Sequence, residues 1–258
     1  MASTRTIQRE FAKQASGFGD PRLTVARTDY LEWMLRHLPL DRSCRVLDVA
    51  AGTGHLSRAL APRVGRVLAV DLTIEMLREL AKEGAAQKVS NLVLVQALGE
   101  NLPVRDGTFD LVVSRLAFHH FDQPANVLRE MVRTCKVDGT IGVIDLVAPD
   151  DATLAQSYNS YERRRDPSHA RALSQDEMWT LLQDAGLRPV LSAGRDIEVC
   201  VEAWLALAQT PSTIGQQLRR HLRAEIQGGE TTGMRPFCRG EDLMFLQRWL
   251  LTVAQKTA

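Results

Sequence analysis

The sequence predicts an α/β protein built around a largely parallel β-sheet. From Arg45 onward, short and continuously apolar runs alternate with segments of helical spacing. Strands of this kind are buried on both faces by helices, which is typical of parallel sheets. Glycines and acidic residues follow several of these runs, at the strand ends where such sheets bind ligands. The 258 residues are enough for one large domain with appendages or for two small domains.

Five strands with helices between them are predicted in the first part of the chain. The strands are expected at 45–50, 66–71, 91–98, 109–116 and 139–147, and the helices at 54–62, at 73–85 and from Pro124 onward. Pro124 suits a first helical turn, because its missing N–H would have no partner there. An earlier helix is expected around Tyr30 to Leu38, where apolar residues recur at helical spacing before Pro39.

The pattern changes after Pro149. Residues 158–174 are polar and aromatic, and the run RRRDPSH within them has the composition of a solvated loop. A helix that contains Met178 should end at Gly186, followed by a strand over 188–200, an amphipathic helix over 212–227 and a loop over 228–237. Residues 243–255 are ambiguous, and their helical spacing alone favours a helix.

Composition excludes several classes of protein. The formal net charge is +1, so the chain lacks the basic character of a nucleic-acid-binding protein. No apolar run reaches the ~18 residues that span a bilayer, and the N-terminus lacks the apolar core of a signal peptide. The four cysteines are scattered, without metal-ligand spacing. We therefore expect a cytoplasmic protein with structural thiols, no metal, no nucleic-acid partner and no membrane partner.

The stretch VLDVAAGTGHL, residues 46–56, predicts a ligand-binding turn after the first strand. Glycines let the backbone approach a ligand, and a helix that begins near Gly54 would present its positive N-terminus. The third glycine of a dinucleotide-binding Gly-x-Gly-x-x-Gly motif is absent, since His55-Leu56-Ser57 follow Gly54. Asp48 would repel a diphosphate and suits a ligand that carries an ammonium or a sulfonium.

A second acidic residue, Asp71, ends the next predicted strand. Its carboxylate can accept hydrogen bonds from both hydroxyls of a ribose, although it can also cap the following helix. Asp48 has an alternative structural role as well, but an acid inside an apolar strand requires a reason. A ribose, a close backbone approach and a positive charge together describe S-adenosylmethionine.

The same residues resemble the class I S-adenosylmethionine-dependent methyltransferases, in particular the group around the ubiquinone/menaquinone C-methyltransferases. VLDVAAGTGHLS is similar to the first motif of that group, and VLAVDLTIEML to the end of its second strand. ENLPVRDGTFDLVVSRLAFHHFDQPANVLREMVRTCKVDGTI is similar to its later run. The resemblance is dense over residues 45–150 and loose elsewhere. Three motifs in order at the right spacing are specific, although each alone is weak.

The resemblance implies a Rossmann-like three-layer sandwich. Its sheet would have seven mostly parallel strands with an antiparallel last strand, and helices on both faces, so 243–255 is expected to be a strand after all. Residues 1–40 would form an N-terminal helical lid segment and 41–258 the methyltransferase domain. That domain would comprise a core (45–150), a substrate-side insertion (about 150–175) and a C-terminal strand and helix region (176–258).

The resemblance also implies which residues bind the cofactor, S-adenosylmethionine, and its product, S-adenosylhomocysteine. The relatives usually have an aspartate, which contacts the adenine amine, where this chain has Leu98. Here backbone, Gln96 or water would have to hold that amine. The expected cofactor residues are Asp48, Ala50, Gly52, Gly54, Asp71, Leu72, Met76, Leu98, Gly99, Glu100, Ser114 and Arg115.

On the acceptor side, His119 and His120 are the catalytic candidates, although a structural role for at least one is equally reasonable. Arg163, Arg164 and Arg165 could bind an acidic substrate or form surface ion pairs. The resemblance and the aromatic content nominate Asp166 and the following substrate-binding residues: Phe11, Phe18, Tyr30, Tyr158, Tyr161, Arg165 and His169.

The predicted function is in-line methyl transfer to a small-molecule acceptor by a monomer or homodimer, with C-, O- and N-methylation all open. A non-catalytic or regulatory protein that binds the same ligands is the alternative. A nicotinamide dehydrogenase is a third reading, disfavoured by the missing glycine.

Overall fold

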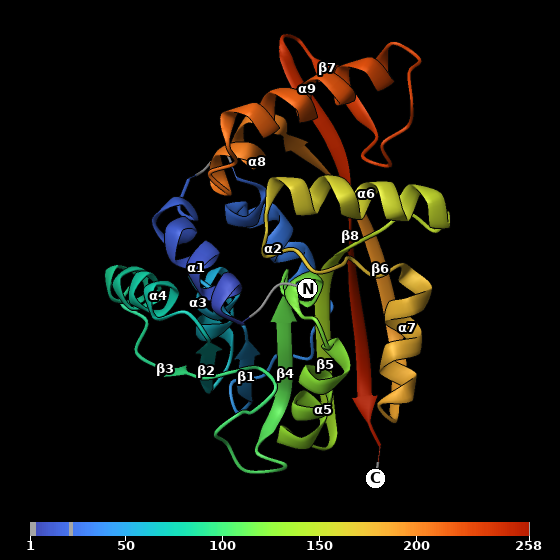
Figure 1. Cartoon of the computed structure of the whole chain (residues 1–258). Helices are drawn as coiled ribbons and strands as arrows, with labels where there is room; N and C mark the ends of the chain where they lie inside the picture. Colours follow the sequence, from blue (N-terminus) through green and yellow to red (C-terminus); the bar gives the residue numbers. More distant parts are fainter. Residues whose placement is uncertain (1–3, 21–22, 258) are drawn as a thin grey trace.

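The computed structural model describes residues 4–20 and 23–257, and at its centre is an eight-stranded mixed sheet (Figure 1). The strand order is β3-β2-β1-β4-β5-β8-β6, and β7 pairs with β8 outside this path. Strands β1 to β5 pair in parallel, whereas β8 is antiparallel to β5, β6 and β7. The strands are β1 Arg45–Val49, β2 Arg66–Asp71, β3 Leu92–Gln96, β4 Phe109–Arg115, β5 Cys135–Val147, β6 Leu187–Cys200, β7 Pro236–Arg239 and β8 Asp242–Lys256.

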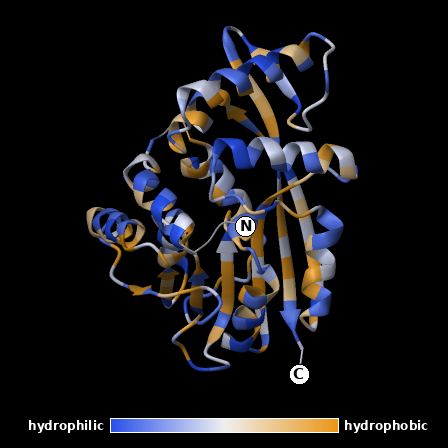
Figure 2. Cartoon of the chain, viewed as in Figure 1, coloured by the Kyte–Doolittle hydropathy of each residue, from blue (hydrophilic) through white to orange (hydrophobic). Residues whose placement is uncertain are grey.

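Helices cover both faces of this sheet, as the alternation of side chains along β1 requires. Leu47 packs in one apolar cluster with residues of α5 and α7, while Val46 packs in another with residues of α2 and α3. Figure 2 shows the strands as mostly apolar and the helices as mixed. The helices are α1 Thr4–Gln14, α2 Thr28–Leu35, α3 His55–Leu60, α4 Ile74–Ala86, α5 Pro124–Thr134, α6 Ala152–Arg165, α7 Gln175–Asp184, α8 Val201–Leu207 and α9 Ser212–Ile226.

The predicted three-layer, mostly parallel fold is confirmed, including the antiparallel strand at 243–255. That segment forms most of β8, which lies between β5 and β6. Trp249 is opposite both Leu146 of β5 and Arg195 of β6. β8 is paired on both edges and covered by helices, so residues on both of its faces are apolar. The helical spacing of some of them is a by-product of this nearly continuous apolar run and does not indicate a helix.

Three segments differ from the predictions made from the residues alone. Residues 152–165 form helix α6, with Asp151 capping it by accepting a hydrogen bond from the Leu154 N–H, so the arginines 163–165 belong to a helix and not to a loop. Helix α8 was not predicted. The expected loop 228–237 ends in β7, which forms a hairpin with β8 and adds an eighth strand to the seven predicted.

The sheet positions a site where the strand order reverses. Strands β2 and β4 lie on either side of β1, so loops that leave the carboxyl ends of β1 and β4 diverge and open a crevice there. Helix α1 approaches the same end through Gln8, whose amide donates to the Leu72 carbonyl oxygen at 3.3 Å. Residues 1–3, 21–22 and 258, which belong to the predicted N-terminal and C-terminal regions, lie outside the described residues. Within the described ranges, no helix is both long and apolar enough to cross a membrane.

Candidate functional site

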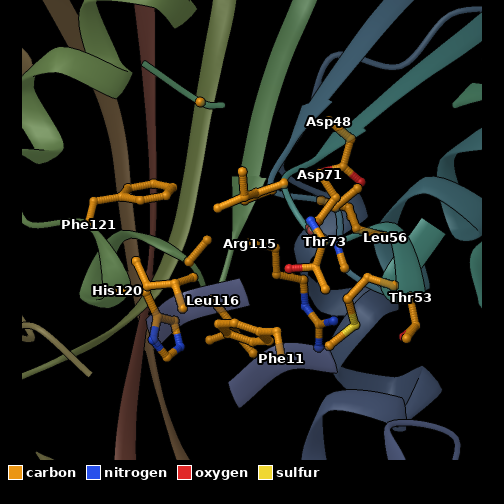
Figure 3. Close-up of a pocket in the computed structure, with 18 of the residues that line it drawn as sticks. Phe11, Asp48, Thr53, Leu56, Asp71, Thr73, Arg115, Leu116, His120 and Phe121 are labelled. Carbon is orange, nitrogen blue, oxygen red and sulfur yellow. Dashed lines mark hydrogen bonds between the residues drawn. The ribbon is translucent and has the colours of Figure 1, made fainter. Parts of the chain in front are cut away.

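A pocket lies at the carboxyl ends of β1, β2 and β4, and we call it the first pocket (Figure 3). Residues of α1 and the segment after it, including Ile7, Phe11 and Phe18, line it opposite the strand ends. The predicted cofactor residues that line it are Asp48, Ala50, Gly52, Asp71, Leu72, Met76, Leu98, Gly99, Glu100 and Arg115. Ten of the twelve candidates spread over residues 48–115 therefore meet around one cavity.

The turn after β1 owes its shape to three residues with positive φ. These are Ala50 at 57°, Gly52 at 56° and Gly54 at 75°. Asp71 fastens the turn to the end of β2, because its Oδ2 accepts a hydrogen bond from the Gly52 N–H at 2.7 Å and its Oδ1 one from the Thr73 N–H at 2.8 Å. The carboxylate that sequence reasoning assigned to a ribose thus also orders the turn. It does not cap α4, which begins at Ile74 with Thr73 at the N-cap position and no side-chain cap hydrogen bond.

Gly54 and Ser114 do not line the first pocket. A Cβ on Gly54 would lie 2.0 Å from Cδ1 of Leu80, so this glycine permits close packing of the turn on α4. The Ser114 hydroxyl donates to the Val49 carbonyl oxygen at 2.8 Å and is fully buried between β4 and β1. Both residues instead hold together the turn, strands and helix that form the pocket.

Asp48 is a buried acid with half of its hydrogen-bonding capacity unused. Its side chain lies within the protein, 1% exposed, and its Oδ2 accepts a hydrogen bond from the Ser57 hydroxyl at 2.5 Å. No residue of the described chain bonds to its Oδ1. Burial raises the pKa of Asp48 to about 7, against the lowering effects of Ser57 and Arg115. Burial likewise raises the pKa of Asp71, to about 6.

Arg115 ends β4 as a buried cation. Its Nη2 donates to the Val25 carbonyl oxygen at 2.9 Å, and its guanidinium lies 5.5 Å from the ring centre of Trp249. Its Nε is buried without a partner in the described chain. Burial lowers the pKa of Arg115 to about 10, an effect that Asp48 opposes, so the group stays charged at neutral pH.

Leu98, where the family resemblance implies an aspartate, lines the first pocket with 40% of its surface exposed. The Gln96 amide, named as a substitute for that aspartate, donates to the Leu72 carbonyl oxygen at 2.9 Å and does not line the pocket. Around Leu98, the residues that line the first pocket contribute mainly apolar side chains and backbone.

A second pocket adjoins the first. Five residues line both: Phe11, Phe18, Val25, Leu116 and His120. The second pocket extends toward α6, α8 and β8, where Trp204 and Trp249 contribute aromatic surface. Glu162, Arg165 and Asp166 line it as well. Arg165 lies between the two acidic groups, with its Nη1 3.9 Å from Oε2 of Glu162 and 3.5 Å from Oδ2 of Asp166.

The two histidines differ in their surroundings. His119 lines only the second pocket, and its Nδ1 lies 2.6 Å from Oδ1 of Asp145 on β5, while its N–H donates to Oδ2 at 2.9 Å. His120 lines both pockets, and its Nδ1 lies 3.0 Å from the Ser168 carbonyl oxygen. Burial, and then the neighbouring His119, lower the pKa of His120 to about 4, so its ring is neutral near pH 7.

The structure divides the predicted substrate residues. Phe11, Phe18 and Arg165 line the second pocket, as does Asp166, whereas the other four lie outside both pockets. Tyr30 packs edge-on against Trp249 in the core, and Tyr158 lines a separate cavity with Leu154 and Arg235. The Tyr161 hydroxyl lies 2.8 Å from Nδ1 of His221, and Nε2 of His169 lies 2.8 Å from the Asn159 side-chain oxygen.

Sequence reasoning missed Asp145, Glu162 and Gln247. Asp145 stands inside the apolar run GVIDLV, and the rule that drew attention to Asp48 could have found it. Glu162 is 1% exposed, and its carboxylate accepts hydrogen bonds from Trp204 at 3.3 Å and Gln247 at 3.2 Å. No local pattern reveals this group, because its partners lie 42 and 85 positions away in the sequence.

The first pocket has the groups that a sulfonium nucleoside requires. Asp71 at the end of β2 holds the glycine turn. Both lie beside the buried Asp48, whose Oδ1 has no partner in the described chain, and Met76 and Leu98 add apolar surface. The fold and this arrangement define a class I methyltransferase architecture.

Comparisons with known proteins agree with that class. The sequence model of the family described as "Methyltransferase domain" matches residues 47–143. The uncharacterized methyltransferase YcgJ of Bacillus subtilis strain 168 is 32% identical over 219 residues, which is 84% of this chain and 85% of YcgJ. The chain therefore belongs to the class I methyltransferase family.

Two solved structures share the fold of this chain, and a further relative is similar to part of its sequence. The crystal structure of YcgJ superposes with a TM-score of 0.81 at 26% identity, covering 90% of this chain and all of that one. The ubiquinone/menaquinone C-methyltransferase of Idiomarina loihiensis is 31% identical over 142 residues, and the chain spans only 55% of its length. A Haemonchus contortus phosphoethanolamine N-methyltransferase, solved with S-adenosyl-L-methionine, shares the fold at 16% identity with a TM-score of 0.66.

Proposed function

We propose that the protein transfers a methyl group from S-adenosylmethionine, held in the first pocket, to a small-molecule acceptor in the second. The observation that supports this most strongly is the meeting of Asp48, the 50–54 turn and Asp71 around one cavity. A dinucleotide would place a diphosphate at the turn, beside the buried Asp48 carboxyl. A sulfonium nucleoside has no such conflict.

Each wall of the first pocket has a part in this proposal. Asp71 accepts hydrogen bonds from the ribose hydroxyls with lone pairs that its two backbone donors leave free. Met76 and Leu98 pack against the adenine, and Asp48 lies on the methionine side. Bound S-adenosylmethionine supplies an activated methyl group, so the protein chiefly has to hold donor and acceptor in line.

The second pocket is the proposed acceptor site, because it shares a wall with the first. Its aromatic and apolar lining, from Phe11 and Phe18 to Trp204 and Trp249, suits a small molecule with substantial apolar surface. If the acceptor arrives protonated, His119 accepts the proton at Nε2, while Asp145 holds its Nδ1. His120 lies between the two pockets and positions the acceptor by contact.

The alternative is a protein that binds the same cofactor without turnover. The observation that favours it is Leu98, which stands where the family resemblance implies an aspartate. Calorimetric titration with S-adenosylmethionine, S-adenosylhomocysteine and NAD separates the classes. Micromolar binding of either adenosyl ligand, without NAD binding, supports the proposal, and NAD binding alone would refute it. A screen of small molecules with radiolabelled methyl donor then distinguishes the enzyme from the non-catalytic protein.

Gel filtration with light scattering tests the predicted monomer or homodimer.

A further inference from the structure

Two adjacent histidines present nitrogens without partners to the second pocket. The ring centres of His119 and His120 lie 4.1 Å apart, and both residues line this pocket. Each ring is bonded to the protein through its Nδ1, and the described chain supplies no hydrogen-bond partner to either Nε2. Neither Nε2 belongs to the fully buried atoms that lack a partner in the described residues, so both reach the cavity. A ligand in the second pocket can therefore bond to both nitrogens.

The partners of the two Nδ1 atoms decide where the ring protons lie. Nδ1 of His119 lies 2.6 Å from Oδ1 of Asp145, a carboxylate that also accepts from the backbone N–H groups of His119 and Leu146. Nδ1 of His120 lies 3.0 Å from the Ser168 carbonyl oxygen. A carboxylate and a carbonyl oxygen can only accept, so each Nδ1 carries a proton. The Nε2 of a neutral ring in this tautomer carries a lone pair.

Two neighbouring lone pairs select a chemical class of ligand. A carboxylate or a phosphate has no hydrogen to donate and would be repelled by them. A hydroxyl donates only one hydrogen and leaves the other nitrogen without a partner, which is costly in a buried site. An ammonium ion or a primary amine has several N–H groups on one nitrogen, so it can serve both histidines at once.

The charges around the second pocket favour the same class. In its described lining, the acidic side chains are Glu162 and Asp166, and the only guanidinium or ammonium group is that of Arg165. Asp145 adds a third carboxyl through its bond to His119. Burial raises the pKa of Glu162, an effect that Arg165 opposes. A buried excess of acidic groups is stabilised by a bound cation, and the aromatic side chains that line this pocket can contact the cation as well.

We propose that the methyl acceptor is a primary amine whose N–H groups donate to Nε2 of His119 and to Nε2 of His120. This inference rests on the proposed function and names its substrate class. The amine enters as an ammonium ion and transfers one proton to Nε2 of His119. The freed lone pair forms the new N–C bond, while the S–C bond breaks and leaves its electron pair on sulfur. The products are an N-methylammonium ion and S-adenosylhomocysteine.

The first test compares acceptors that share one carbon skeleton and needs no variant. Wild-type protein with radiolabelled S-adenosylmethionine is incubated with phenethylamine, phenethyl alcohol and phenylacetate, and with the corresponding sets built on benzyl, cyclohexylmethyl and indolylethyl groups. Because an alcohol leaves one histidine nitrogen unpaired, we expect the amine of a set to be methylated about 10- to 100-fold faster than the alcohol. The carboxylate should not react.

The contrary results of this test are distinct from one another. Faster methylation of an alcohol, a carboxylate or a ring carbon overturns the inference and leaves the methyl-transfer function standing. Failure to bind S-adenosylmethionine, or binding without methylation of any member, refutes the enzymatic function on which the inference rests.

The second test separates hydrogen bonding from charge. The best amine of the first test and its trimethylammonium analogue, which has the same charge but no N–H group, are titrated by calorimetry into protein loaded with S-adenosylhomocysteine. The amine should bind about 10- to 100-fold more tightly, because only the amine donates hydrogen bonds. Equal affinity would assign recognition to charge and aromatic contact and would overturn the role of the histidines.

Variants of His120 complete this test. His120→Met should weaken binding of the amine by about 10-fold or more but that of the trimethylammonium analogue by less than about 3-fold. His120→Gln, which retains an acceptor, should keep most of the amine affinity. His221→Met is the matched control, since His221 bonds to Tyr161 outside both pockets, and it should bind both ligands as the wild type does. Equal weakening of both ligands in His120→Met would assign His120 a structural role and overturn the inference.

Discussion

Asp48 resists ionisation in the folded protein, because its carboxyl is buried and has only one hydrogen-bond donor. Its pKa of about 7 lies above that of an aspartate in an unfolded chain. Between about pH 4 and 7 the native state therefore binds more protons than the unfolded state. The free energy of unfolding consequently falls as the pH rises through this range. Asp71, with a pKa of about 6, acts in the same direction.

Asp48→Asn should therefore stabilise the ligand-free protein while weakening cofactor binding. Asparagine can still accept the Ser57 hydrogen bond, and it removes the cost of a buried charge. We expect the free energy of unfolding at pH 8 to rise by on the order of 1–3 kcal/mol, with little change at pH 5. Denaturant titration at the two pH values measures this effect.

Asp110→Asn is a suitable control, because Asp110 lies at the opposite end of the sheet and its carboxylate pairs with Lys136. This change should leave stability unaltered or lower it. An Asp48→Asn protein that is less stable than wild type at pH 8 would show that its carboxylate is a structural group.

Asp145→Asn should reduce the rate of methyl transfer without changing cofactor affinity. The carboxylate holds Nδ1 of His119, and a positioned general base contributes about 10²- to 10⁴-fold. A fall in kcat of about 100-fold is expected, with calorimetry showing unchanged S-adenosylhomocysteine binding.

Tyr161→Phe provides the matched comparison, because the Tyr161 hydroxyl bonds to His221 outside both pockets. Its kcat should equal that of the wild type. Unchanged kcat in Asp145→Asn would exclude proton transfer through His119.

At the scale of elements, the packing of α3 on α4 depends on Gly54. The residue has φ of 75°, and a Cβ there would overlap the Leu80 side chain on α4. Gly54→Ala should lower the free energy of unfolding by about 2–4 kcal/mol, the sum of backbone strain and overpacking. Thermal denaturation measures the loss.

Gly52→Ala separates the two contributions. Gly52 also has positive φ, but a Cβ there would meet no atom within 4 Å. Its cost to stability should be about 1 kcal/mol. Because Gly52 lines the first pocket, the larger effect should be on cofactor affinity. Equal destabilisation by both changes would argue against the steric role of Leu80.

The elements that the sequence predicted are those marked by a local pattern of apolar residues. Strands β1, β2 and β4 and helices α4 and α5 follow from apolar runs, and the turn between β1 and α3 follows from its glycines. Residues alone favoured a helix where β8 lies, because its partners β5 and β6 are distant in sequence. Only the family resemblance corrected this prediction. Helix α6 and the acids Asp145 and Glu162 were missed for a similar reason, since burial by remote segments decides their roles.

At the scale of the whole molecule, the two pockets are assembled from segments far apart in sequence. Gln14 at the end of α1 donates to Asp166 at 3.4 Å, and Gln209 after α8 donates to the Lys13 carbonyl oxygen at 2.9 Å. Arg115 joins β4 to Val25. The predicted division into a lid segment and a core domain stays a prediction, but the described part of the lid contacts both pockets.

Cofactor binding should therefore stabilise α1 as well as the glycine turn. Hydrogen exchange of the amides in residues 4–14 should slow on addition of S-adenosylhomocysteine, because Ile7 and Phe11 line the first pocket, the proposed cofactor site. The amides of α9, which lies outside both pockets, serve as the internal control and should not change. Equal slowing in both helices would indicate global stabilisation by the ligand in place of closure by α1.

The central position of β8 has a consequence for how the protein is made. Strands β5 and β6 emerge from the ribosome well before β8, the last strand of the sheet along the chain. Until β8 arrives between them, β5 lacks its partner along Thr140–Val147 and β6 along Leu187–Cys200, and such unpaired edges promote association between chains. Cofactor-site residues up to Arg115 are synthesised early, yet the sheet that supports them closes late. Chaperone protection during synthesis should thus be required mainly while residues 148–241 are being added.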